Sequence, residues 1–149
     1  GQLGNSGGQK FWSWYGFESR VEWCACFASW CAEQSGMVAS GQVLKFSSCA
    51  VGASWFQGQG RWKGKGYTPS AGDFIFFDWN KDGQVDHVGI VVNVANGRVN
   101  TIEGNTSNMV ARRSYQFGGI VIVGYGYIYN LLTKYPPCYI FITINVINI

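Results

Sequence analysis

The chain has 149 residues, a length typical of one domain that is large enough to bury an apolar core. Aromatic residues make up 17% of the chain and charged residues 13%, a composition that excludes an intrinsically disordered protein. The net charge of +3 is too small to indicate a nucleic-acid-binding protein, and no apolar stretch is long enough to span a membrane. Because the sequence starts at Gly1, without an initiator Met or a signal peptide, we expect a mature form or a domain of a longer protein.

The first strongly patterned segment is a predicted helix over residues 22–36. Cys24, Phe27 and Cys31 recur at steps of three and four residues, which is helical spacing, and Gly36 is a typical C-terminal stop. This places Cys24 in the first turn of the helix and Cys31 two turns further on. A second short helix is predicted near residues 47–60, followed by a loop rich in Gly that contains Pro.

From residue 73 onward the pattern changes to strands. Five segments rich in aromatic and β-branched residues are predicted strands: residues 73–79, 86–95, 98–105, 109–115 and 119–128. Helices followed by antiparallel strands are typical of an α+β domain, which we place at residues 1–130. The remaining tail, residues 131–149, contains two prolines and ends in an apolar run, so it is either an extra strand or a non-native appendage.

One histidine, His87, is present in the sequence, and it is the natural candidate for a general base near neutral pH. Cys24 is the natural nucleophile, because a thiol in the first turn of a helix lies near the positive end of the helix dipole, which favours the thiolate. A histidine supplied by the sheet would complete an activated Cys–His pair. Lone histidines and free cysteines are more often structural, and we expect Cys26 and Cys31 to be core residues.

A Cys–His pair needs a third polar group that holds the imidazole in one orientation. Asp86 is a poor candidate because neighbouring residues on a strand point to opposite faces. Glu103 and Asn105 lie two residues apart on the returning strand, so they share one face.

Whether that face is the one that carries His87 depends on the register of the hairpin. A three-residue tip, with Val94 opposite Arg98 and Gly97 at positive φ, would put Glu103 opposite Gly89 and Asn105 opposite His87. A two-residue turn that pairs Ala95 with Arg98 throughout would turn Glu103 away from His87. We therefore predict the three-residue tip, with Gly89 leaving room beside the histidine.

A metal site is the main alternative use of these residues. The segment DWNKDGQVDH matches the first half of a calcium loop, with candidate ligands at Asp78, Asn80, Asp82 and Asp86. The match is incomplete, because Gly89 stands where a bidentate Glu is expected, and Asp-Gly is also a common hairpin turn. Zinc bound by Cys24, Cys26, Cys31 and His87 is disfavoured by the C-x-C-x₄-C spacing.

Disulfides are the other alternative. Five cysteines are an odd number, so at least one is free or pairs outside the chain. Cys26 and Cys31 lie on different sides of the predicted helix, which disfavours a bond between them, whereas a bond between Cys31 and Cys49 stays open.

Several of these segments together resemble one known family. EWCACFASWCAEQSGM, PSAGDFIFFDW, DHVGIVVNV, TIEGNTSN and IVGYGYI, in this order, are similar to the CHAP domain, the cysteine, histidine-dependent amidohydrolase/peptidase of the papain-like superfamily. The resemblance covers about residues 1–130 and implies a papain-like α+β fold with helices packed on an antiparallel sheet. It implies Cys24 as nucleophile, His87 as base, Glu103 as its orienter and Asn105 as an auxiliary polar group.

The resemblance implies an enzyme that hydrolyses amide bonds of bacterial peptidoglycan through a thioester, either as an N-acetylmuramoyl-L-alanine amidase or as a peptide-bridge endopeptidase. We expect a secreted or wall-associated monomer of bacterial or phage origin that requires no cofactor, with calcium as a candidate ligand. Trp23, Gly89 and Trp79 are candidate substrate contacts. Two other functions stay open: an inactive wall-binding module that uses exposed Trp and basic residues, and a papain-like protease that acts on proteins.

Overall fold

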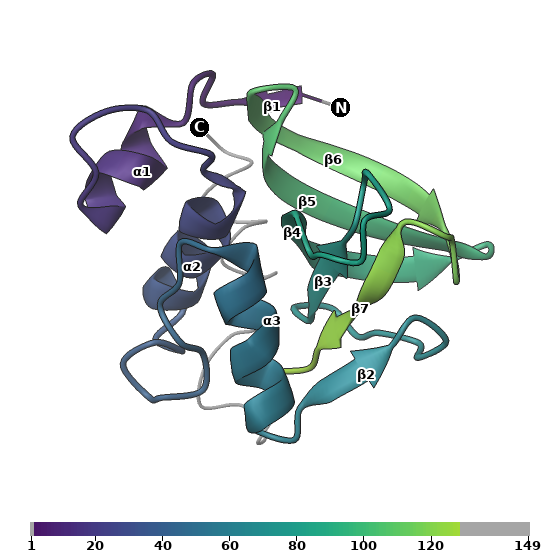
Figure 1. The fold of residues 1–149 in the computed structure, drawn as a ribbon. Helices are drawn as coiled ribbons and strands as arrows, with labels where there is room; N and C mark the ends of the chain where they lie inside the picture. Colours follow the sequence, from purple (N-terminus) through teal and green to yellow (C-terminus); the bar gives the residue numbers. More distant parts are fainter. Residues whose placement is uncertain (1, 129–149) are drawn as a thin grey trace.

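The computed structural model describes residues 2–128 and has the predicted α+β architecture (Figure 1). In this range the chain forms three helices, α1 (Gln9–Tyr15), α2 (Cys24–Gln34) and α3 (Cys49–Gly58), which lie on one side of a single sheet. None of the described helices is long and apolar enough to cross a membrane. The predicted tail, residues 131–149, lies outside the described residues.

Seven antiparallel strands make the sheet, in the order β1-β6-β5-β4-β3-β7-β2. Their bounds are β1 (Gln2–Gly4), β2 (Trp62–Gly64), β3 (Phe74–Phe77), β4 (His87–Ala95), β5 (Arg98–Thr106), β6 (Met109–Gln116) and β7 (Ile122–Gly126). The five predicted strands and both predicted helices are confirmed. Helix α1 and the two short strands β1 and β2 were not predicted, and β2 lies inside the segment that we expected to be a loop.

The β4–β5 hairpin has a different tip from the one predicted. Ala95, not Val94, pairs with Arg98, and both Asn96 (φ 53°) and Gly97 (φ 71°) are left-handed, as in a two-residue type I′ turn. The prediction of a positive φ at Gly97 is confirmed, and the prediction that Val94 pairs with Arg98 is wrong.

A bulge further down the hairpin restores the register that was predicted for the site. The pairing shifts by one residue between Val91 and Asn93, so Val91 pairs with Thr101 and Ile90 with Ile102. The extra residue therefore lies at Val92 instead of at the tip. Beyond the bulge Glu103 returns to the face that carries His87, because a one-residue shift exchanges the two faces of a strand.

Helix α2 packs directly on strands β4 and β5, and this contact places the start of the helix beside the start of β4. Gly104 permits the close approach, since a Cβ at this position would lie only 2.4 Å from the Cβ of Phe27 on α2. The main core fills the space between helices and sheet and includes Phe11, Trp23 and Phe27, with Phe11 stacked on Trp23 at 5.6 Å. A second buried cluster, around Phe77 and Tyr125, lies on the other face of the sheet, since successive residues of a strand point to opposite faces.

Candidate active site

Cys24 is the first residue of α2, so its thiol lies at the N-terminal end of the helix as predicted. The residue is 5% exposed and lines a pocket of about 320 Å³. The N–H groups of a first helical turn have no partner within the helix, so this end of α2 can stabilise negative charge on a nearby atom. Cys26 and Cys31 are fully buried in the core, which confirms that they are packing residues.

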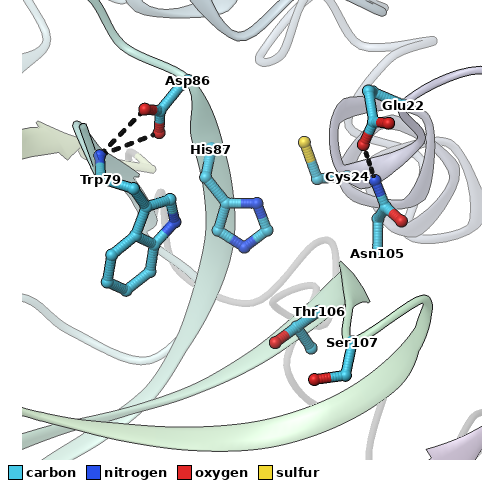
Figure 2. Close-up of a pocket in the computed structure, with 8 residues that line it drawn as sticks. All are labelled: Glu22, Cys24, Trp79, Asp86, His87, Asn105, Thr106 and Ser107. Atoms are coloured by element: carbon cyan, nitrogen blue, oxygen red, sulfur yellow. Dashed lines mark hydrogen bonds between the residues drawn. The ribbon is translucent and has the colours of Figure 1, made fainter. Parts of the chain in front are cut away.

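His87 is the first residue of β4, and its ring faces Cys24 across the pocket (Figure 2). Its Nε2 lies 2.7 Å from Oε1 of Glu103, which is fully buried. Nδ1 is therefore the ring nitrogen that remains for the cysteine sulfur. The three side chains form a linear Cys–His–Glu arrangement, in which the carboxylate fixes the ring that faces the thiol.

Two hydroxyl groups hold the other oxygen of this carboxylate. Tyr115 donates a hydrogen bond of 2.7 Å to Oε2 of Glu103, and the Thr101 hydroxyl donates to the same oxygen. Thr101 lies two residues before Glu103 on β5, and Tyr115 lies on the neighbouring strand β6. The sequence analysis missed both residues, although Thr101 shares the strand face of Glu103 by simple alternation.

The pKa values of Cys24 and His87 are shifted in opposite directions, that of Cys24 down and that of His87 up. A hydrogen bond with the thiol of Cys49, together with the hydrogen bond and positive charge of His87, holds the pKa of Cys24 well below its ordinary value despite burial. Burial alone would lower the pKa of His87, but hydrogen bonds and negative charge from Cys24 and Glu103 outweigh it and raise the pKa to about 10. Both shifts favour a thiolate–imidazolium pair over a neutral thiol and imidazole.

The pocket has an aromatic wall and a polar wall (Figure 2). Trp79 forms the aromatic wall, 43% exposed and stacked on Phe77, with its ring centroid 6.1 Å from that of His87. The polar wall is made of Glu22, Asn105, Thr106 and Ser107. The Asn105 side chain donates to Glu22 across this wall, so Glu22 lies at the pocket mouth and not inside the helix predicted to include it.

Asn105 does not lie in the place predicted for it. Strand β5 is irregular between Glu103 and Thr106, and Asn105 adopts a left-handed φ of 55°. Its side chain therefore turns to Glu22 and to Arg20, which donates to its Oδ1 at 3.1 Å. It lines the pocket opposite His87 and has no hydrogen bond with the imidazole in the structure.

Two of the candidate substrate contacts have structural roles instead. Trp23 is fully buried in the core against Phe11, because the residue before the helix turns inward. Gly89 does not line this pocket, and a Cβ there would lie 2.6 Å from Cγ of Glu103. The room that Gly89 provides is thus occupied by the carboxylate that orients His87. Trp79 is the candidate contact that does line the pocket.

The candidate calcium loop is closed by its own hydrogen bonds. Asp86 accepts from the N–H of Trp79 at 2.9 Å, and Asp78 accepts from the N–H of Gly83 at 2.8 Å. Asp82 accepts from the N–H of Gln84, and the Asn80 amide donates to Asp82. Among residues 2–128 no three His, Cys, Asp or Glu side chains gather in a way that could hold a metal ion.

Cys49 is a residue of this site that the sequence analysis did not assign to it. It carries a free thiol, so the open alternative of a bond to Cys31 is excluded in the structure. Its Sγ lies 3.5 Å from Sγ of Cys24. Cys49 is the first residue of α3, as Cys24 is of α2, but no sequence pattern says that two helix starts meet.

Comparisons with known proteins identify the family to which the chain is similar. The family model of the CHAP domain matches residues 14–105, a range that contains Cys24, His87 and Glu103. Two solved structures of Ly7917, one of them with the hydrolyzing product of MDP, are similar at 22% and 20% sequence identity, each with a TM-score of 0.48. Each match covers 68% of this chain, which spans about half of the other chain (52% and 51%). No curated protein matches.

Proposed function

Because the chain belongs to the CHAP domain family, we propose that it is a peptidoglycan hydrolase that cleaves amide bonds through a cysteine thioester. The observation that carries the proposal is the ordered set Cys24, His87 and Glu103, which lies in a pocket that opens to solvent. A buried imidazole between a thiol and a carboxylate is the arrangement that acyl transfer requires.

In the first half of the proposed reaction the Cys24 thiolate attacks the amide carbonyl carbon. The carbonyl electrons move to oxygen, and the backbone N–H of Cys24, at the start of α2, stabilises the oxyanion. The imidazolium of His87 then gives its proton to the nitrogen, the carbon–nitrogen bond breaks, and the amine leaves. Cys24 is left as a thioester of the acyl fragment.

In the second half neutral His87 takes a proton from a water molecule, which attacks the thioester carbonyl. The carbon–sulfur bond breaks and the thiolate is regenerated, while the acid product leaves. Glu103 keeps the same ring orientation in both halves, because its own position is fixed by Thr101 and Tyr115.

The substrate assignment rests on the family and on the form of the pocket. Trp79 offers an exposed aromatic surface beside His87, and such surfaces stack on sugar rings and apolar stems. Since peptidoglycan lies outside the cell membrane, the proposal places the protein in the secreted or wall-associated class, acting as a monomer. The inactive module and the protein-directed protease are the competing functions, and an assembled Cys–His–Glu set favours an active enzyme over the module.

Digestion of purified Gram-positive cell walls by the wild type and by Cys24→Ala tests the proposal. We expect the wild type to release soluble fragments and the variant to release none, although both bind the walls. Mass spectrometry of the products then identifies the bond: a free lactyl carboxyl group on muramic acid means an amidase, and cut stems or cross-bridges mean an endopeptidase. Binding without release by the wild type would support the inactive module, and cleavage of denatured protein but not of walls would support the protease.

A further inference from the structure

The nucleophile has a second thiol as its direct neighbour. Sγ of Cys49 lies 3.5 Å from Sγ of Cys24, both residues are at most 9% exposed, and each is the first residue of a helix. The acyl-transfer mechanism needs one sulfur and leaves Cys49 without a chemical step. A second cysteine at van der Waals distance from a thiolate is, however, placed to react with it once that thiolate is oxidised.

We propose that Cys24 and Cys49 form a reversible disulfide when a hydroperoxide reaches the pocket, so that Cys49 protects the nucleophile from irreversible oxidation. The inference rests on the proposed function in one respect, that Cys24 is the reactive thiolate. Its substrate is a small peroxide, a class that can enter through the opening that Cys24 lines.

The reaction balances with the peroxide as the oxidant. The Cys24 thiolate attacks one peroxide oxygen, the oxygen–oxygen bond breaks, and the leaving oxygen takes a proton from His87, which gives a sulfenic acid and water or an alcohol. The Cys49 thiol then attacks the sulfenic sulfur, its proton leaves with the hydroxyl group as water, and the disulfide forms. Two thiol sulfurs have then each lost one electron, and the peroxide has gained two.

The local geometry requires little movement. A disulfide has an S–S distance of about 2.05 Å, so the two sulfurs must approach by about 1.5 Å, which rotation about the side-chain bonds of two neighbouring cysteines can supply. Both residues lie at the ends of helices and not in the middle of a packed segment. The fold can therefore accept the bond without separating α2 from the sheet.

Cys26 is not an equivalent partner, although it is nearer to Cys24 in sequence. It is fully buried in the core, and two residues along a helix point in different directions. Burial and the negative charge of Cys24 also raise the pKa of its thiol to about 11. Cys26→Ala is therefore the matched control, since it removes a neighbouring thiol that the proposal does not use.

The test treats the purified wild-type chain with hydrogen peroxide, blocks the remaining thiols with an alkylating reagent, and maps the cysteines by peptide mass spectrometry without reduction. We expect one linked peptide pair, Cys24 with Cys49, which disappears after dithiothreitol, and the same pair in Cys26→Ala. In Cys49→Ala we expect Cys24 to advance to the sulfinic acid, which dithiothreitol does not reverse. Wall digestion should fall to background in oxidised wild type and return with dithiothreitol, and should not return in Cys49→Ala.

The inference is overturned if peroxide leaves Cys49 open to alkylation while Cys24 is oxidised, or if Cys24 pairs with any other cysteine. These results come from the wild type, so they hold whether or not Cys49→Ala folds. If untreated wild type digests walls and no Cys24–Cys49 pair forms, the inference fails and the proposed function stands. If the pair forms but untreated protein digests nothing, the proposed function fails and the thiol chemistry stands.

Discussion

Among single residues, Glu103 shows how many contacts support the proton transfer that we propose for His87. It is fully buried, with one oxygen on His87 and the other on Thr101 and Tyr115. Three partners on a carboxylate with no access to water fix its direction. Burial of the phenol and, after it in size, the charge and hydrogen bond of Glu103 raise the pKa of Tyr115 well above its ordinary value. The phenol therefore stays a proton donor at any working pH.

We predict that Tyr115→Phe, and to a similar extent Thr101→Val, lowers kcat about tenfold with little change in KM, because each removes one of the donors that orient Glu103. A tenfold loss corresponds to about 1.4 kcal/mol, within the usual range for a hydrogen bond to a charged group. Steady-state kinetics on soluble wall fragments measures the effect. If the variants instead lose thermal stability together with kcat, and their KM rises, Tyr115 and Thr101 support only the fold.

The sequence predicts the positions of Cys24, His87 and Glu103 correctly, but not those of Asn105 and Cys49 beside them. Cys24 and His87 are accessible to reasoning because a helix start and a single histidine are local features, and Glu103 follows from strand alternation. Asn105 was misplaced because a left-handed residue interrupts its strand, and no pattern in the sequence signals that interruption. Cys49 was missed because its meeting with Cys24 depends on how two helices pack.

Among the elements, the β4–β5 hairpin determines whether the site exists. Its two-residue tip alone would direct Glu103 away from His87, and the bulge at Val92 reverses this by one residue. The sequence predicts that an extra residue is needed in this hairpin, but a bulge has nearly the same effect at several positions along a strand. Its location depends on packing against neighbouring strands, which the sequence pattern does not contain.

Strand β4 also provides the space that Glu103 occupies, and Gly89→Ala tests this. A Cβ at Gly89 would lie 2.6 Å from Cγ of Glu103, so we expect the carboxylate to shift and kcat/KM to fall on the order of a hundredfold. Gly64→Ala on β2 is the matched control, because a Cβ there meets nothing within 4 Å. Circular dichroism checks that Gly89→Ala is folded. If the folded variant has the kcat/KM of the wild type, Glu103 does not need its present position.

For the whole molecule, the fold class was predictable because composition, helical spacing and strand alternation agree along the chain. The short elements α1, β1 and β2 were not, since three to seven residues are too few to show a period. Helix α1 illustrates why a short element cannot be predicted from its own sequence pattern. Phe11 is buried among Trp23, Phe27 and Trp30, so the helix is stabilised by tertiary contacts that only the folded chain supplies.

The ion pair predicts an unusual pH dependence of stability. The raised pKa of His87 contributes stability below its ordinary pKa of 6.5 that is lost as pH rises towards about 10. The lowered pKa of Cys24 contributes stability above its ordinary pKa of 9.0 that is lost as pH falls. Between these two ordinary values the raised pKa of His87 and the lowered pKa of Cys24 act in opposite directions on the proton balance, so their effects on stability offset each other.

Cys24→Ser removes one half of this balance. In the variant the Cys24 thiolate no longer raises the pKa of His87, so Glu103 is the group that holds a proton on the ring above pH 6.5, where the unfolded chain has lost it. Its free energy of unfolding should therefore fall with rising pH, by up to about 1.4 kcal/mol per pH unit, relative to the wild type. Urea unfolding at several pH values measures both curves, and parallel curves would show that Glu103 by itself does not hold the His87 proton.

The pH dependence of Cys24 alkylation by iodoacetamide, located by peptide mass spectrometry, tests the central claim that Cys49 and His87 stabilise Cys24 as a thiolate. We predict that the rate reaches half its plateau far below pH 9.0, the ordinary pKa of the thiol, and that His87→Ala moves this midpoint up towards it. A wild-type midpoint at or above the ordinary value, unchanged by His87→Ala, would contradict the account.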